Sequence, residues 1–306
     1  MNVKIQQIKE SISKVIVGKD IAITQTIIAL LCGGHILLED VPGVGKTRLA
    51  TALAKSVNGK FNRIQLTPDV MPSDITGFSM VNQITHEFEY REGSAMCNFL
   101  LADEINRASP KVQSALLEAM EEGQLTVDGV THPLPQPFMV LATQNPVETS
   151  GTYRLPEAQT DRFFMRIKMG YPTQQEEMKI FDNNAKNNTD FETSITIDEV
   201  LLLKKEIEHI KVAPQVKEYI INLTSKTRKD DDVLLGVSPR GSIALFQGIK
   251  ALAFIFERDF AIPEDVKELA VSILSHRIIL SAKGKSKFLN TENYVTELLK
   301  IVNVPI

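Results

Sequence analysis

The chain has no tryptophan and few aromatic residues of any kind, and each shortage excludes a class of protein. Phe, Tyr and Trp make up 6% of the 306 residues, so side chains on which bases could stack are few. The two cysteines, Cys32 and Cys97, have neither the spacing of a metal site nor the number needed for a disulfide framework. This usage fits a reducing compartment, and we expect a cytoplasmic protein.

Charge of one sign is also lacking, because 34 Lys and Arg against 38 Asp and Glu leave a net charge of −4. A basic footprint for nucleic acid is therefore absent from the chain as a whole. The N-terminus has no signal-peptide core. The uncharged run 21–38 is interrupted by polar residues and by Gly33-Gly34, and we interpret it as an amphipathic helix, a stop and a buried strand. We expect no membrane span.

The order of the remaining patterns divides the chain into two halves. Up to residue 171, short apolar runs alternate with helical patterns, which predicts an α/β fold with a mostly parallel five-stranded sheet between helices. Ligands of such sheets bind at the carboxyl ends of the strands. The runs are residues 35–40, 61–66, 98–105, 138–145 and 162–169.

Two segments break this alternation. Residues 77–93 contain an alternating stretch, and residues 124–134 form a predicted hairpin around Asp128-Gly129. From Pro172 helical patterns dominate, so 172–306 is predicted to be a second, helical domain. Within it, the lysines around Gly284 are interpreted as a solvated loop.

A glycine-containing loop, DVPGVGKT, runs from Asp40 to Thr47 between an expected strand and an expected helix. Exposed amides of such a loop, together with a helix N-terminus, cradle phosphate oxygens. Lys46 would reach the β- and γ-phosphates, and Thr47 would place its hydroxyl on Mg²⁺. Asp40 stands where the strict phosphate-loop pattern has glycine. The loop predicts a nucleotide site.

Polar residues end the next two core strands. Asp103 and Glu104 follow an apolar run, which suits an acid that holds Mg²⁺ and a second acid that polarises the attacking water. Asn145 ends the following run, where its amide could bridge the water and the γ-phosphate. It could equally be a turn residue before Pro146.

Two arginines are further candidates. Arg162 begins the last core run, and its guanidinium could stabilise a transferring phosphoryl group in cis or from a neighbour, or could pair with Asp161. Arg240 lies in the first turn of a helix capped by Ser238, where a cation opposes the helix dipole by ~0.3–1 kcal/mol. A phosphate or a neighbouring acid would offset that cost.

Taken in order, these motifs resemble the MoxR family of AAA+ ATPases over about residues 10–285. The resemblance implies an αβα nucleotide domain over 1–171 and a helical lid over 172–306, assembled as a homo-oligomeric ring that is usually a hexamer. It also implies ATP and Mg²⁺ as cofactors. The motifs are EDVPGVGKT, TPDVMPSDITG, LLADEINRASPKVQSALLEAMEE, ATQNPVETSGTY, LPEAQTDRF and SPRGS.

The same resemblance implies a role for each candidate residue. Thr47 and Asp103 serve the metal and Glu104 the water, while Asn145 is the sensor amide. Arg162 becomes an arginine finger acting in trans, and Arg240 becomes the lid sensor. The nucleotide-binding residues are Val17 and Gly18, which border the adenine, and Asp40, Val41, Pro42, Gly43, Val44, Gly45, Lys46, Thr47 and Arg48.

Segment 77–93 corresponds to the family's helix-2 insert and segment 124–134 to its pre-sensor hairpin, both facing the ring pore or a client. The chain departs from the family pattern at 95–98, 148–151 and 153–155, away from the phosphate chemistry. Family members are chaperone-like remodellers of client proteins, often beside a protein with a von Willebrand factor A domain, and no residue here identifies that partner.

Two other functions stay open. A DNA translocase of the related helicase clade should carry clustered Lys and Arg on its inserts, whereas these inserts are acidic or neutral, so nucleic acid is not expected as a partner. A nucleotide-gated scaffold without hydrolysis would not need Glu104, Asn145 and Arg162 together.

Overall fold

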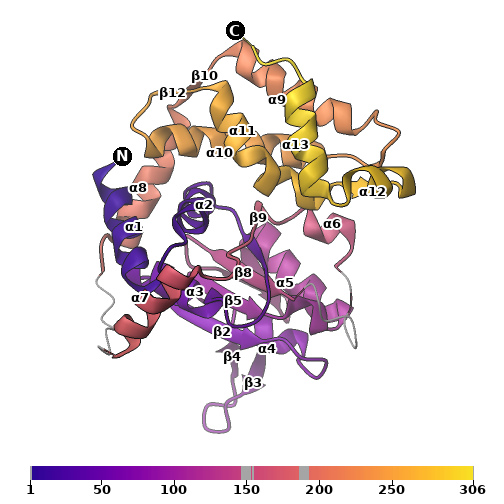
Figure 1. The fold of residues 1–306 in the computed structure, drawn as a ribbon. Coiled ribbons are helices and arrows are strands. Elements are labelled where there is room, and N and C mark those ends of the chain that lie inside the picture. The colour runs from indigo at the N-terminus through magenta and orange to yellow at the C-terminus, as the bar shows by residue number, and fades with distance from the viewer. Residues whose placement is uncertain (1, 146–152, 154, 186–192, 306) are drawn as a thin grey trace.

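The computed structural model describes residues 2–145, 153, 155–185 and 193–305 (Figure 1). Departures from the family pattern at 148–151 and at Arg154, and the segment of the ATQNPVETSGTY motif from 146 to 152, lie outside these residues.

A five-stranded sheet in the order β2-β5-β8-β1-β9 forms the centre of the first half, and every neighbouring pair in it is parallel. Every residue of β5 is buried, as expected for a strand covered on both faces. The predicted α/β fold class is therefore confirmed. The strands are β1 (Ile36–Glu39), β2 (Phe61–Gln65), β5 (Phe99–Asp103), β8 (Met139–Gln144) and β9 (Met165–Ile167).

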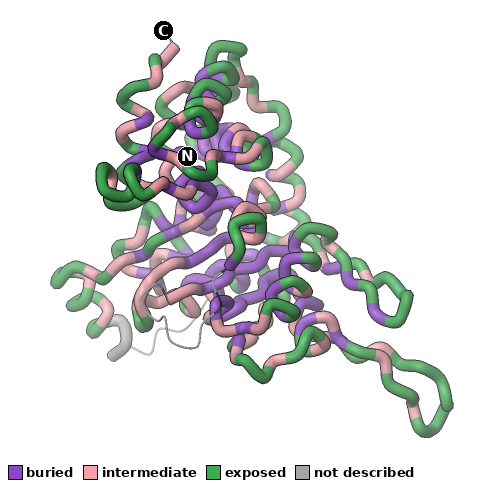
Figure 2. Tube along the Cα trace, turned by 90° about the vertical axis from the view of Figure 1, so that its right-hand side faces the viewer, coloured by how far each residue is buried: buried purple, intermediate pink, exposed green. Residues whose placement is uncertain are grey.

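Alternating side chains of these strands enter two apolar cores, one on each face of the sheet. Ile36 and Leu38 of β1 pack with α1 (Val3–Val15), α2 (Asp20–Leu31), α3 (Lys46–Ser56) and the C-terminal helices. Leu37 points to the other face, which α4 (Pro72–Thr76) and α5 (Pro110–Glu122) cover. Figure 2 shows the resulting band of buried residues through the middle of the molecule.

Helix α2 differs from the amphipathic helix expected from its sequence, because the residues from Thr26 to Leu31 are all buried. The side that solvent would occupy is covered by α8 (Ile197–Glu208) and α10 (Pro239–Ile255) of the C-terminal half. The apolar core on this face of the sheet therefore continues without a break into the lid.

Both inserts are antiparallel hairpins. β3 (Gly77–Val81) pairs with β4 (Phe88–Glu92), and β6 (Gln124–Val127) pairs with β7 (Val130–Pro133). Asp128 and Gly129 have φ of +50° and +79°, the two positive values that a tight hairpin turn requires. In Figure 1 the β3–β4 hairpin lies at the end of the molecule opposite the lid.

Helices dominate the second half, with two short strand pairs between them. None of the helices that the structure describes is long and apolar enough to cross a membrane. The short helix α6 (Glu157–Thr160) still belongs to the first half. Besides α8 and α10, the helices of the second half are α7 (Gln174–Ala185), α9 (Pro214–Thr227), α11 (Pro263–Leu274), α12 (Ala282–Phe288) and α13 (Thr291–Ile301). The strand pairs are β10 (Lys211–Val212) with β12 (Phe260–Ala261) and β11 (Val233–Leu235) with β13 (Ile279–Leu280).

Helix α12 corrects the interpretation of the lysines around Gly284 as a solvated loop. Lys283 and Lys287 both form ion pairs with the buried Asp232, at 3.3 and 2.8 Å. A Cβ on Gly284 would lie 2.0 Å from the carbonyl oxygen of Asp232, so glycine is required by the close approach of the two backbones. The partner is about fifty residues away in the sequence, so local charge patterning could not reveal it.

His35 fastens the sheet to α5 immediately before β1. Its Nδ1 accepts a hydrogen bond from the backbone N–H of Val140 at 3.0 Å, so the ring proton lies on Nε2, which donates to the Met120 carbonyl at 3.0 Å. Burial lowers the pKa of His35 from 6.5 to about 4. At pH values between about 4 and 6.5, His35 is therefore neutral in the folded protein and protonated in the unfolded chain.

A group whose folded pKa is lowered costs stability as the pH falls from its unfolded value towards its folded one, here from 6.5 towards 4. We expect His35→Gln, which removes this titration, to lose less free energy of unfolding than the unchanged protein between pH 7 and pH 5, by roughly 2 kcal/mol. Urea titrations at the two pH values measure the difference, and equal losses in both proteins would contradict this account.

Candidate active site

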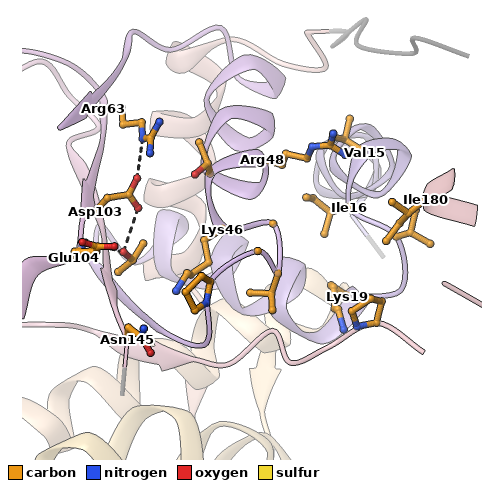
Figure 3. A pocket seen from close by; sticks show the side chains of 18 residues that line it. Val15, Ile16, Lys19, Lys46, Arg48, Arg63, Asp103, Glu104, Asn145 and Ile180 are labelled. Carbon is orange, nitrogen blue, oxygen red and sulfur yellow. Dashed lines mark hydrogen bonds and ion pairs between the residues drawn. The ribbon is translucent and has the colours of Figure 1, made fainter. Parts of the chain in front are cut away.

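A cavity of about 560 Å³ opens at the carboxyl edge of the sheet, within the size range of small-molecule sites (Figure 3). Three parts of the chain surround it: the loop before α3, the ends of β5 and β8, and an apolar wall from the start and middle of the chain. The lining residues are Val15, Ile16, Val17, Lys19, Pro42, Gly43, Val44, Gly45, Lys46, Thr47, Arg48, Arg63, Asp103, Glu104, Thr143, Asn145, Pro172 and Ile180.

The loop owes its shape to two glycines in the left-handed region. Gly43 has φ +87°, and Gly45, the N-cap of α3, has φ +97°. No atom lies within 4 Å of a Cβ built on Gly43, so the backbone conformation and not space favours glycine there. The loop leads into the N-terminus of an 11-residue helix, where free amides and the helix dipole favour an anion.

Lys46 is the first residue of α3, where the loop ends, and its Nζ donates to the backbone carbonyl of Asp40 at 2.7 Å. Burial lowers the pKa of Lys46, while the carboxylates of Asp40, Asp103 and Glu104 act in the opposite direction. A phosphate oxygen is a stronger acceptor than a neutral carbonyl, because the hydrogen bond is then between two charged groups. The loop and its lysine therefore fit a polyphosphate.

Asp103, at the end of β5, is held by two residues that the sequence did not suggest. Its Oδ2 accepts from Arg63 Nε at 2.7 Å, and its Oδ1 accepts from the hydroxyl of Thr143 at 3.1 Å. Figure 3 shows both contacts as dashed lines. Arg63 reaches Asp103 because the pairing of β2 with β5 places it two residues from the partner of Asp103, on the same face.

Glu104 has φ +58°, which is uncommon for a residue with a side chain and clusters at functional sites. The backbone N–H of Glu104 donates to the Thr143 hydroxyl at 2.9 Å, and the Glu104 carboxylate pairs with Arg107 at 3.0 Å. Asn145, two residues beyond Thr143 at the end of β8, lines the same cavity. The structure thus brings Lys46, Glu104 and Asn145 to one cavity.

The oxygen donors in the cavity fit Mg²⁺ bound together with a nucleotide. Thr47 and Asp103 supply a hydroxyl and a carboxylate, the ligand types that Mg²⁺ prefers. Among the described residues, no group of three or more His, Cys, Asp or Glu side chains could hold a metal alone. A Mg²⁺ ion would need phosphate oxygens and water to complete its coordination, as is usual for this ion.

Three residues expected to bind nucleotide lie outside the cavity lining: Gly18, Asp40 and Val41. The Asp40 carboxylate accepts instead from the backbone N–H groups of Met169 and Gly170, at 2.5 and 2.8 Å. The side chain that replaces the glycine of the strict pattern therefore ties the loop to the segment leading into the lid.

Arg162 and Arg240 also lie outside this cavity. Both pair with Glu121, at 2.9 and 2.5 Å. Arg240 thus has a neighbouring acid as its partner, one of the two possibilities that its sequence position suggested. The suggested pair of Arg162 with Asp161 does not form, because Asp161 pairs with Arg277 at 2.9 Å.

Comparisons with known proteins agree with this site. Residues 35–165 match the ATPase family associated with various cellular activities (AAA), and residues 225–297 match the AAA lid domain. The chain is 38% identical to the chaperone MoxR1 of Mycobacterium tuberculosis over 96% of this chain and 80% of that protein, and 51% identical to the uncharacterized protein YeaC of Bacillus subtilis over 97% and 93%.

The fold is also similar to a solved structure from Cytophaga hutchinsonii, provisionally described as an ATPase, with a TM-score of 0.91 and 40% identity over 99% of this chain and 95% of that one. Fold, loop and relatives agree: this chain is an ATP-hydrolysing enzyme and belongs to the MoxR family of AAA+ ATPases.

Proposed function

We propose that the protein hydrolyses Mg-ATP in sites shared between neighbouring subunits of a hexameric ring and uses the energy to remodel client proteins. The observation that carries the proposal is the division of the candidate residues. Lys46, Glu104 and Asn145 line one cavity, whereas Arg162 and Arg240 lie together elsewhere on the same chain. Such a chain needs a neighbour to complete its site.

In this proposal Lys46 and the amides of the loop bind the β- and γ-phosphates. Thr47 and Asp103 hold Mg²⁺, which when bound neutralises charge on the phosphates. Thr143 and Arg63 keep the Asp103 carboxylate in place through its two oxygens. These contacts leave the remaining lone pairs of the carboxylate for the metal or its water.

Glu104 acts as the base that orients the attacking water, and the Asn145 amide holds the same water against the γ-phosphate. The hydroxyl of Thr143 supports this arrangement, since it binds the backbone of Glu104 and the side chain of Asp103 at once. Arg162 of the adjacent subunit stabilises the charge of the transferring group.

The base of the nucleotide lies against the apolar wall of the cavity. Val17 and Pro172 both line the cavity on this wall. The segment before Pro172 is fixed at two points: Asp40 binds the N–H groups of Met169 and Gly170, and Lys19 donates to the Tyr171 carbonyl at 2.9 Å. The wall that meets the base is therefore tied to the loop that meets the phosphates.

The β3–β4 hairpin supports a protein client. It exposes several large apolar side chains at once, which is unusual for a surface without a partner. They are Phe78, Met80, Val81, Ile84 and Phe88, with exposed fractions between 41% and 90%. A MoxR relative is named a chaperone, which agrees with a remodelling role. A partner with a von Willebrand factor A domain and a cytoplasmic location remain expectations from the family.

A DNA translocase is less well supported. The same hairpin carries Glu87, Glu89 and Glu92 against Arg91, and an acidic hairpin repels the phosphate backbone. Stimulation of ATP turnover by DNA would favour the translocase over the remodeller.

Replacement of the proposed base separates binding from chemistry. Glu104→Gln keeps size and hydrogen-bonding capacity but cannot accept the proton, so we expect ATP affinity close to that of the unchanged protein and hydrolysis at least ~100-fold slower. Calorimetry and phosphate release measure the two quantities. Glu264→Gln, the same change at an exposed position on α11, is the control. Hydrolysis at the normal rate by the Glu104 variant would remove this residue from its role.

Asp40→Asn tests whether the contact between the phosphate-binding loop and the segment before Pro172 helps to bind the nucleobase. Asparagine is neutral, so the two backbone hydrogen bonds to this side chain lose the charge that strengthens them. We therefore expect the segment before Pro172 to be held less firmly, and the affinity for ATP to fall by about tenfold relative to the affinity for inorganic tripolyphosphate. The ratio of the two affinities cancels the change in charge beside the phosphates. Asp128→Asn in the β6–β7 turn is the matched control. An unchanged ratio in the Asp40 variant would show that the tie does not serve the base.

A further inference from the structure

One carboxylate holds both arginines. Glu121 lies at the end of α5, and each of its oxygens takes one partner: Oε2 pairs with Arg162 at 2.9 Å and Oε1 pairs with Arg240 at 2.5 Å. The two arginines come from different halves of the chain, one before β9 and the other in the first turn of α10. Glu121 is thus the point where the candidate residues for a neighbour's phosphate meet.

The backbones of the two arginines are fixed side by side by a separate contact. Asp161 accepts from Arg277 Nε at 2.9 Å with one oxygen and from the Ser238 hydroxyl at 2.8 Å with the other. Ser238 is the N-cap of α10, and the side chain of Arg277 is only 1% exposed. This buried contact holds the start of α10 beside Arg162, whatever the side chains of Arg162 and Arg240 do.

The side chains of Arg162 and Arg240, by contrast, are partly exposed. Arg162 is 31% exposed, Arg240 is 47% exposed and Glu121 is 36% exposed. Ion pairs in such positions contribute little to folding stability, whereas arginine and phosphate form two parallel, charge-assisted hydrogen bonds. A phosphate brought close to Arg162 and Arg240 would therefore replace Glu121 as the partner of both side chains, and this exchange needs only side-chain rotation.

A carboxylate at this place has a cost that the arginines relieve. Glu118, Glu121 and Glu122 crowd the last turn of α5, the end of a helix where its dipole disfavours negative charge. When the arginines leave, Glu121 regains that unfavourable setting. Glu121 therefore gains from its contacts with the arginines, and it competes with a phosphate for their guanidinium groups.

We propose that Glu121 is a positioning residue that holds Arg162 and Arg240 in the separate subunit and releases them to the phosphate of the neighbouring subunit's nucleotide when the ring forms. The inference rests on the proposed shared site and adds a competitor to it. Assembly with ATP must first break two ion pairs within each subunit.

The test compares Glu121→Gln with the unchanged chain by measuring ATPase activity per chain as a function of protein concentration. Without the competing carboxylate, the concentration that gives half-maximal activity should fall by about two- to tenfold, the range expected for two exposed ion pairs. Maximal activity should not decrease. Glu122→Gln, which removes the same charge from the adjacent position, should leave the midpoint unchanged.

Two further measurements keep the outcomes distinct. Thermal unfolding of Glu121→Gln should match that of Glu122→Gln, which shows that the fold is intact. In a chain that carries both Arg162→Ala and Arg240→Ala, adding Glu121→Gln should no longer shift the concentration of half-maximal ring assembly, measured by light scattering, because neither arginine is left to be released. An unchanged midpoint or a lower maximal rate in Glu121→Gln alone would overturn the inference while leaving the shared site standing. Activity per chain that does not depend on concentration in the unchanged protein would overturn the shared site, and the inference with it.

Discussion

The ion pair between Asp161 and Arg277 joins the last strand of the sheet to the lid, and the placement of the candidate arginines depends on it. Burial lowers the pKa of Arg277 to about 10, and the neighbouring Asp161 offsets part of that effect. Removing one partner of a buried pair leaves the other charge without compensation and typically costs about 3–5 kcal/mol. Gly241 adds a steric condition, since a Cβ there would lie 2.7 Å from the Cδ of Arg277.

With the lid held by this contact, the cavity residues and the two candidate arginines lie in different parts of the subunit. In the proposed mechanism, the loop and the ends of β5 and β8 bind the phosphates and orient the water, and Thr143 contacts both acidic residues there. The arginines that would stabilise the transition state lie beside Glu121, on a different part of the chain. We expect a subunit built in this way to bind nucleotide alone and to need a partner for turnover.

Much of this arrangement could be predicted from the sequence, because it depends on local patterns. The loop from Asp40 to Thr47 and the turn at Asp128-Gly129 each need specific backbone conformations that glycine supplies, so their motifs are readable one by one. The five strands follow from short apolar runs for the same reason. The ends of β5 and β8 meet because the strands are parallel neighbours, which brings Asp103, Glu104 and Asn145 to one edge.

What could not be predicted depends on contacts between distant parts of the chain. Arg63 contacts Asp103 only through the register of β2 against β5, and the second half of α2 is buried all round because the lid covers it. Asp40 stands where the strict phosphate-loop pattern has glycine, and its carboxylate binds backbone groups about 130 residues away. Glu121 is one of three glutamates among the last five residues of α5. No spacing in the sequence relates it to Arg162 and Arg240.

The central claim is that each active site is completed by the adjacent subunit, and a mixture of two inactive variants tests it most directly. Arg162→Ala keeps its own loop but lacks the finger, and Lys46→Ala keeps the finger but cannot hold phosphate. Each variant alone should hydrolyse ATP poorly, and the mixture should recover activity, because some interfaces then pair an intact loop with an intact finger worth ~10³–10⁵ in rate. No recovery, in a sample where mass measurements detect mixed rings, would contradict the account.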